Sequence, residues 1–229
     1  MNSFASPQTL VALPFAPSVD DLYARIFEAI LEQQIHPGSR FTEESLAQMF
    51  GVRRSDVREV LMQLSHQQII ILRVNHRPRV AEIDAEQTRQ TLHARRLAEV
   101  MLVRLACQRP CPQDLKRLRA LIEREHLCAE RGPAIRLSGE FHLRLAEMAG
   151  NAPLAHFLGS LVPLTSLTLA QFDAQVDGYC TWRAHAGIID AVERRDAAMA
   201  VTLMNRHLDH LEEMLLNPVS ILGKNRVAG

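Results

Sequence analysis

The stretch Met-Phe-Gly-Val-Arg-Arg-Ser-Asp-Val-Arg-Glu-Val-Leu, residues 49–61, decides the fold of the first part of this chain. Its Gly51-Val52 pair ends one helical pattern, and Arg53, Arg54 and Arg58 open the next one. Because Arg54 and Arg58 are four residues apart, they share one face of a helix. The positions that pack on a core form an apolar stripe at helical spacing: Val57, Val60, Leu61 and Leu64.

Two further helices precede this one. Apolar residues recur at helical spacing over residues 20–35, with Ser18 as the N-cap, and Pro37-Gly38 ends the pattern. Thr42 caps a second, short helix that runs to Phe50, and the arginine-bearing helix extends to about residue 66. Two short helices joined by a tight glycine turn form a helix-turn-helix.

The pattern then changes from helix to strand. A β-branched run covers residues 69–74, the segment Asn75-His76-Arg77-Pro78 interrupts it, and alternation resumes over residues 79–83. This predicts a β-hairpin, and a hairpin directly after a helix-turn-helix is a wing. Residues 18–83 are therefore predicted to form a winged helix of three helices plus a β-hairpin.

The remainder predicts only helices. Breaks at proline, glycine and aspartate separate six helices at 85–108, 112–131, 134–149, 152–172, 179–194 and 196–216, and Pro163 should kink or divide the fourth. The fold class is mainly α, with the winged helix followed by an all-α bundle of six or seven helices over residues 84–217. Residues 1–17 are expected to be a mobile arm and residues 218–229 a flexible tail.

The net charge of the chain does not by itself indicate binding to nucleic acid. The formal net charge of the chain is zero, and residues 20–83 hold eight arginines and nine carboxylates, a net charge of −1. Binding to DNA must therefore rest on where the arginines lie. Six of the eight lie between residues 53 and 79, which favours a patch.

The cysteines and the apolar runs indicate the compartment. Cys107, Cys111, Cys128 and Cys180 form no CxxC pair, so reduced thiols are expected. The N-terminal segment has no signal-peptide pattern, and no apolar run approaches the roughly 20 residues that span a bilayer. We expect a cytoplasmic protein that does not contact a membrane.

A helix with one apolar face and guanidinium groups at its N-terminal end suits the major groove of DNA. The alternative is a solvated helix face whose arginines form surface ion pairs, for example Arg58 with Glu59 or Asp56.

The ordered series of short motifs resembles the GntR family of bacterial transcription regulators, in the FadR-like branch with an FCD effector-binding domain. The resemblance covers residues 20–216. In the first half it is carried by Pro37-Gly38, Leu46-Ala47, Gly51-Val52, Arg54 and Val57-Arg58-Glu59. In the second half it is carried by Arg95, Arg96, Glu99, Phe141-His142, Gly150-Asn151, His185 and Met204-Asn205-Arg206-His207-Leu208.

The resemblance implies a homodimeric regulator, most often a repressor, that binds palindromic operator DNA and has no catalytic residues. A small organic acid bound in the bundle would alter the affinity for DNA. Arg54 and Arg58 match the recognition-helix arginines, which would pair with guanine. Arg53, Arg40 and Ser55 would contact phosphate. Arg77 stands where the wing tip usually has glycine, so it would enter the minor groove or contact phosphate.

The resemblance also implies a metal site of three histidines, His142, His185 and His207. The family often adds an aspartate four residues before the first histidine, where this chain has Ser138. Three imidazoles suit a divalent metal such as zinc or nickel. Arg95, Arg96 and Arg144 are candidates to hold an effector carboxylate, and Ser138 is a fourth candidate effector-binding residue. The alternative is three partly buried histidines that bond to their neighbours.

Two other functions remain open at this point. Three histidines with an open position also describe catalytic zinc, so a metal-dependent enzyme is one alternative. A dimerisation module on a DNA anchor, without an effector, is the other.

Overall fold

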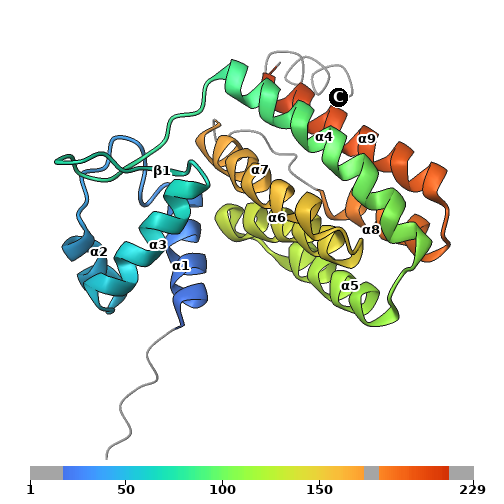
Figure 1. Ribbon diagram of the computed structural model, residues 1–229, viewed down its shortest axis with the longest axis horizontal. Helices are drawn as coiled ribbons and strands as arrows, with labels where there is room; N and C mark the ends of the chain where they lie inside the picture. The colour runs from blue at the N-terminus through green and yellow to red at the C-terminus, as the bar shows by residue number, and fades with distance from the viewer. Residues whose placement is uncertain (1–17, 173–180, 217–229) are drawn as a thin grey trace, which may run out of the picture.

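The computed structural model describes residues 18–172 and 181–216, and within these ranges it confirms the predicted fold class. The predicted arm at 1–17, the tail at 218–229 and the turn at Asp177-Gly178 lie outside the described residues. Figure 1 shows the helices α1–α3 and the wing on one side and the helices α4–α9 on the other. The first group comprises α1 Val19–Leu31, α2 Glu43–Phe50, α3 Arg54–His66, β1 Ile70–Ile71 and β2 Arg79–Val80.

Local capping explains where the first helices begin and end. Ser18 and Asp21 form a capping box at the start of α1, as the sequence predicts for Ser18, and Thr42 and Ser45 form another at the start of α2. Gly51 ends α2 with φ of 66°, a left-handed conformation that glycine adopts without steric cost. The expectation that α1 reaches residue 35 is wrong, because Gln33 takes a left-handed φ of 60°.

The wing is an antiparallel hairpin in which Ile70 pairs with Val80 and Ile71 with Arg79. Its strands are shorter than the runs at 69–74 and 79–83, since only these two pairs form the ladder. The positive φ that the turn needs, 60°, falls on Asn75, which tolerates it better than most residues. The wing tip therefore forms without a glycine at Arg77.

The second group is the bundle: α4 Ala85–Gln108, α5 Pro112–Leu127, α6 Arg131–Met148, α7 Ala152–Gln171, α8 Trp182–Glu193 and α9 Ala197–Leu216. Helix α4 packs along α9 and α7, and α6 packs between α5 and α7. The break expected at Gly132-Pro133 lies instead just before Arg131. Pro133 is accommodated in the first turn of α6, where its missing N–H would have no intrahelical partner.

Helix α7 is one continuous helix, so of the kink or division expected at Pro163 the division is wrong. Pro163 and the residues beside it, Val162 and Leu164, are buried, and this packing holds the helix together where a backbone hydrogen bond is missing. By length and composition alone α7 is apolar enough to cross a membrane, with a mean hydropathy of 1.3. It packs on α4 and α6, as core helices of bundles do.

Helix α1 lies against the bundle, so the two groups share an apolar core. One cluster of buried residues runs from Leu22 and Ile30 of α1 to Ile135 of α6 and Leu167 of α7. Polar contacts border it: Arg136 Nε lies 3.2 Å from Glu28 Oε1. The side-chain amide of Gln171 donates to the carbonyl oxygen of Ala81 over 2.6 Å and so ties α7 to the wing.

Candidate functional site

Three histidines from three helices meet in the bundle core. His142 lies on α6, His185 on α8 and His207 on α9, and all three are buried. Their potential ligand nitrogens lie within 4.8 Å of one another, and His142 Nε2 is 3.1 Å from His207 Nε2. The tertiary structure thus brings together the three residues that the sequence analysis named as metal ligands.

Two buried carboxylates orient two of these rings. His142 Nδ1 lies 2.5 Å from Glu99 Oε2 of α4, and His185 Nδ1 lies 2.8 Å from Glu125 Oε2 of α5. When Nδ1 donates to a carboxylate, Nε2 is left as the unprotonated nitrogen that can bind a cation. His185 Nε2 is buried and has no hydrogen-bond partner among the described residues. This orphaned nitrogen fits a site built for a bound group.

Burial keeps the imidazoles of His142 and His207 neutral. It lowers the pKa of His142 to about 4, although the charge of Glu99 opposes the shift. Burial, and after it the neighbouring histidines, lower the pKa of His207 well below its usual value. Burial would raise the pKa of Glu99, but the charge of Arg95 and the interaction with His142 outweigh it and lower that pKa to about 2. Metal binding requires unprotonated imidazoles, and the lowered pKa values of His142 and His207 meet this requirement.

Arg95 and Ser138 lie in the same buried region. Arg95 Nε donates to Glu99 Oε1 over 2.7 Å, and Arg95 Nη2 is buried without a partner among the described residues. Ser138 is one helical turn before His142, and its Oγ lies 3.3 Å from Thr181 Oγ1, which also bonds to Glu125. Ser138 therefore belongs to the hydrogen-bond network behind His185.

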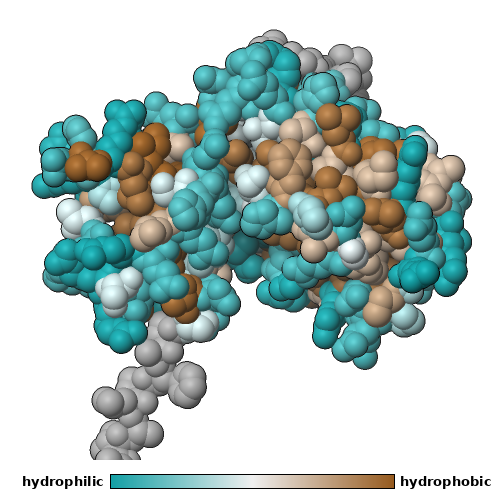
Figure 2. Space-filling model, viewed as in Figure 1, coloured by the Kyte–Doolittle hydropathy of each residue, from teal (hydrophilic) through white to brown (hydrophobic). Residues whose placement is uncertain are grey.

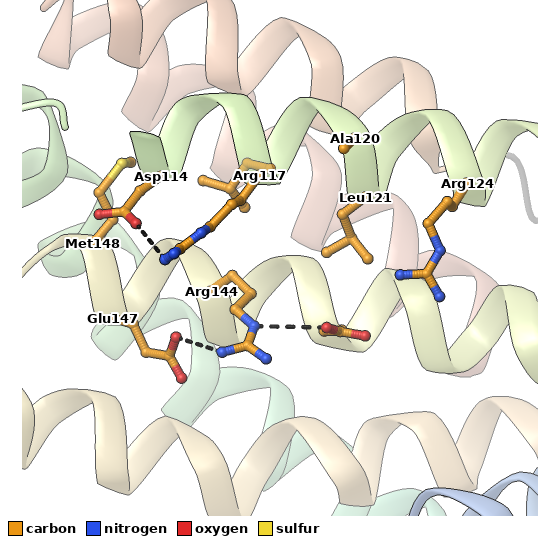
Figure 3. Close-up of a pocket in the computed structure, with 10 residues that line it drawn as sticks. Asp114, Arg117, Ala120, Leu121, Arg124, Arg144, Glu147 and Met148 are labelled. Atoms are coloured by element: carbon orange, nitrogen blue, oxygen red, sulfur yellow. Dashed lines mark hydrogen bonds and ion pairs between the residues drawn. The ribbon is translucent and has the colours of Figure 1, made fainter. Parts of the chain in front are cut away.

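The structure does not bring Arg96 and Arg144 to the histidines. Arg96 joins α4 to α9 through ion pairs with Asp209 at 2.7 Å and Glu212 at 3.1 Å. Arg144 is half exposed in a groove between α5 and α6, where it pairs with Glu147 and Glu140 (Figure 3). Both lie on helix faces that point away from the core, because each is one residue from the buried face that carries Arg95 or Leu145.

Sequence reasoning missed the roles of Glu99 and Glu125. The sequence pattern that could have indicated these roles is a charged residue inside an apolar stripe. Glu99 lies between Leu92 and Leu102 at helical spacing. Glu125 follows Leu118 and Leu121 at the same spacing. A carboxylate at a core position is rarely buried without a partner. Which partner it meets depends on how the helices pack.

The second candidate region is the exposed face of α3. Arg54 and Arg58 lie side by side, and both pair with Glu43 of α2, which Arg58 Nη2 approaches to 2.7 Å and Arg54 Nη2 to 3.2 Å. The hydrogen bond from Arg58 is the largest cause of a lowered pKa at Glu43. The two arginines that the sequence analysis assigned to base reading therefore share one carboxylate.

Arg53, Ser55 and Asp56 form a second group at the start of α3. Arg53 pairs with Asp56 through Nε at 3.0 Å and Nη2 at 2.9 Å, and the Ser55 hydroxyl donates to Asp56 over 3.1 Å. Asp56 holds its neighbours rather than capping the helix, since α3 has no side-chain N-cap bond. The arginines of α3 therefore do form surface ion pairs, as the alternative to DNA binding expected. The partners differ, because Arg58 pairs with Glu43 and Asp56 pairs with Arg53.

Two arginines of the wing, Arg77 and Arg79, lie close to Arg40 from the segment before α2. Arg40, Arg77 and Arg79 line one hollow, with Pro37-Gly38-Ser39 and Pro78 completing it. Arg79 was not among the predicted site residues. The sequence could have indicated Arg79, because it opens the second strand of the wing two residues after Arg77.

Comparison with known proteins identifies the family of each half of the chain. Residues 18–80 match the family described as bacterial regulatory proteins, gntR family, and residues 90–210 match the FCD domain. The chain is 25% identical over 205 residues to the HTH-type transcriptional regulator LutR of Bacillus subtilis (strain 168), covering 80% of this chain and 94% of LutR. It is 24% identical over 208 residues to the HTH-type transcriptional repressor RspR of Escherichia coli (strain K12), covering 87% and 90%.

Solved structures share the fold. The structure described as E. coli McbR/YncC matches with a TM-score of 0.73 and 18% identity, covering 86% of this chain and 96% of that one. A putative GntR regulator from Rhodococcus sp. RHA1 matches with a TM-score of 0.70 and 18% identity, covering 86% and 97%.

The buried pair of Arg95 and Glu99 yields a stability prediction. Glu99→Gln removes the charge that balances Arg95 in the core and leaves one acceptor oxygen for Arg95 Nε and His142 Nδ1, so we expect a loss of about 3–5 kcal/mol in the free energy of unfolding. Urea denaturation followed by circular dichroism measures it. The double variant Arg95→Met with Glu99→Leu removes both charges and should recover much of the loss; a Glu99→Gln loss below about 1 kcal/mol would contradict the assignment.

Proposed function

Because the chain belongs to the GntR family of bacterial regulatory proteins, in the FadR-like branch with an FCD domain, we propose how its two candidate regions share the work of regulation. The chain is a DNA-binding transcription regulator and not an enzyme, and the metal-dependent enzyme alternative is not favoured by its relatives. GntR regulators bind operator DNA and small-molecule effectors. The proposals below concern which residues do so here, with residues 18–83 as the DNA-binding unit and 84–217 as the effector unit.

The observation that carries the DNA proposal is the exposed pair of guanidinium groups on α3. Arg54 and Arg58 read guanine in the major groove, because both project from one face of a helix whose other face is packed on the core. Arg53 and Ser55 at the start of α3 contact phosphate. Arg40, Arg77 and Arg79, which line one hollow, contact the phosphate backbone of the DNA beside the wing.

Replacing the reading arginines tests this assignment. Arg54→Ala and Arg58→Ala should each weaken binding to the operator by about 1–3 kcal/mol, since each removes a base contact. Fluorescence anisotropy with a duplex selected by the protein from a random library measures the affinity, with a scrambled duplex as reference. Arg89→Ala, which removes an exposed arginine of α4, is the control. Unchanged operator affinity in both α3 variants would refute the assignment.

The observation that carries the metal proposal is the set of three buried imidazoles close to one another, with His185 Nε2 left without a hydrogen-bond partner among the described residues. FCD domains commonly bind metals, and we propose that His142, His185 and His207 hold zinc or nickel here. Glu99 and Glu125 fix the orientation of two of the rings. Ser138 supplies no charge, so a bound metal would keep its Lewis acidity for an anionic effector.

We propose that the effector is a small organic acid and that Arg95 holds its carboxylate. Arg95 is the one predicted effector arginine that lies in the buried region with the histidines, and its Nη2 has no partner among the described residues. A buried guanidinium donor without an acceptor is costly, and a carboxylate would satisfy it.

Metal analysis of the purified protein tests the histidine site. The wild-type chain should hold roughly stoichiometric zinc or nickel by mass spectrometry, and His142→Ala with His185→Ala and His207→Ala should hold almost none, because three ligands are lost together. His156→Ala, which removes an exposed histidine of α7, should leave the metal content unchanged. Equal metal content in the triple variant and the wild type would rule out this site.

A palindromic operator requires two copies, and the bundle offers a face for the second. Leu97 and Met101 of α4 are 67% and 47% exposed, and Phe157 of the neighbouring α7 is 46% exposed. Figure 2 shows hydrophobic side chains at the surface over these helices. Apolar area of this kind is more often buried in an interface. We propose that α4 and α7 form the contact between the two chains of a homodimer.

A charge placed on this face should separate the two chains. Leu97→Glu with Met101→Glu should convert a dimer to a monomer, because two carboxylates would lose their water in the interface. Size-exclusion chromatography with light scattering measures the mass. Leu127→Glu, at an exposed leucine of α5, should remain a dimer. A double variant that keeps the wild-type mass would exclude the α4–α7 contact.

We also propose that the protein acts as a repressor in the cytoplasm. RspR, to which the chain is similar over most of its length, is named a repressor. The buried, unpaired cysteine Cys107 fits a reducing compartment.

A further inference from the structure

Glu43 holds both arginines that the proposed function assigns to base reading. Its Oε1 accepts from Arg58 Nε over 2.9 Å, and its Oε2 accepts from Arg58 Nη2 over 2.7 Å and from Arg54 Nη2 over 3.2 Å. The contact with Arg58 is a bidentate fork, which fixes the plane of a guanidinium group better than a single bond does.

The position of Glu43 is itself well defined. It is the first residue of α2, between Thr42 and Ser45 of the capping box, and its side chain is 24% exposed. The side chains of Arg54 and Arg58 are 57% and 61% exposed. A partly buried carboxylate therefore stands behind two guanidinium groups that face solvent.

The contacts with the carboxylates occupy one edge of each guanidinium group and leave another edge without a partner among the described residues. Glu43 takes the Nε and Nη2 side of Arg58, and Arg54 presents Nη2 to Glu43 and Nε to Glu44 at 3.4 Å. Since an arginine has five N–H donors, the end edge formed by Nη1 and the second N–H of Nη2 stays available. This end edge can donate both bonds to O6 and N7 of guanine while Glu43 still holds the other side.

The same contacts limit attraction to phosphate. Arg53, Arg54 and Arg58 are matched by Asp56, Glu44 and Glu43, so this part of the reading face carries no net charge. Binding to DNA of any sequence depends on cationic side chains that neutralise phosphates. Arginines already paired with carboxylates contribute less to it.

We propose that Glu43 is a specificity-determining residue, which orients Arg54 and Arg58 towards base edges and withholds their charge from phosphates of other sequences. This inference rests on the proposed function of Arg54 and Arg58. It concerns the ratio of affinities for operator and non-operator DNA rather than the affinity for either alone.

The variant Glu43→Gln tests it, because glutamine keeps the size and one acceptor but removes the charge. Anisotropy titrations over a salt series are run on the full chain, with the library-selected duplex and its scrambled version. We expect the salt slope on the scrambled duplex to steepen by about 0.9 for each guanidinium released to phosphate. The ratio of operator to scrambled affinity should fall by about fivefold or more, as when one bidentate base contact is lost.

Glu44→Gln is the matched control. Glu44 lies next to Glu43 in the first turn of α2, so both changes weaken the helix by a similar dipole effect, but Glu44 contacts only Arg54. A melting curve of each variant confirms equal folding. A ratio and a salt slope that are the same in the Glu43 and Glu44 variants would overturn the inference.

The double variant Arg54→Ala with Arg58→Ala separates the two proposals. If it loses the preference for the selected duplex while Glu43→Gln keeps it, Arg54 and Arg58 read bases and Glu43 has no part in specificity. If the double variant keeps the preference, the reading assignment is wrong, and the inference on Glu43 is overturned with it.

Discussion

The bond between the Glu99 carboxylate and His142 Nδ1, 2.5 Å long and buried, is the interaction on which the bundle core depends. It joins α4 to α6, and Arg95 on α4 completes the charge balance. A buried carboxylate without these partners would cost several kcal/mol. The same bond selects the tautomer of His142, so one contact serves both the packing of two helices and the chemistry of the site.

The chain uses ion pairs in two environments, and the environment decides what each pair does. The side chains of Arg95 and Glu99 are 3% and 2% exposed, so water cannot replace either partner. Removing one of them would therefore cost a large free energy. The pairs of Glu43 with Arg54 and Arg58 face solvent, where an ion pair contributes little to stability and the remaining N–H donors of each guanidinium group stay accessible. The first kind is suited to a permanent site, and the second to a surface that meets DNA.

Helix α6 connects the two regions physically. It carries His142 and Ser138 in the bundle core, and about two and three turns before His142 it carries Arg136 and Gly132 against α1. A Cβ at Gly132 would lie 2.3 Å from Glu32 Cγ, so the approach of the two helices is close. A displacement of α6 at the histidines would therefore reach the helix that supports the winged helix.

Local patterns in the sequence determined most of the secondary structure. Helical spacing, the Ser18 and Thr42 caps and Gly51 predicted α1–α3, and the six bundle helices follow from proline and glycine breaks. These signals act within a few residues, so the chain alone carries them. The errors occurred at helix ends, at the short wing strands and at Pro163, where a left-handed φ or tertiary packing outweighed the local pattern.

The sequence by itself therefore determined the fold class, the helix that bears the arginines and the three histidines of the candidate metal site. Only the tertiary structure decided that Glu99, Glu125 and Arg95 surround those histidines, that Arg96 and Arg144 do not, and that Glu43 lies behind Arg54 and Arg58. The physical reason is that each of these contacts joins different helices. Spacing along one helix shows which face a residue shares, but only packing shows which helix that face meets.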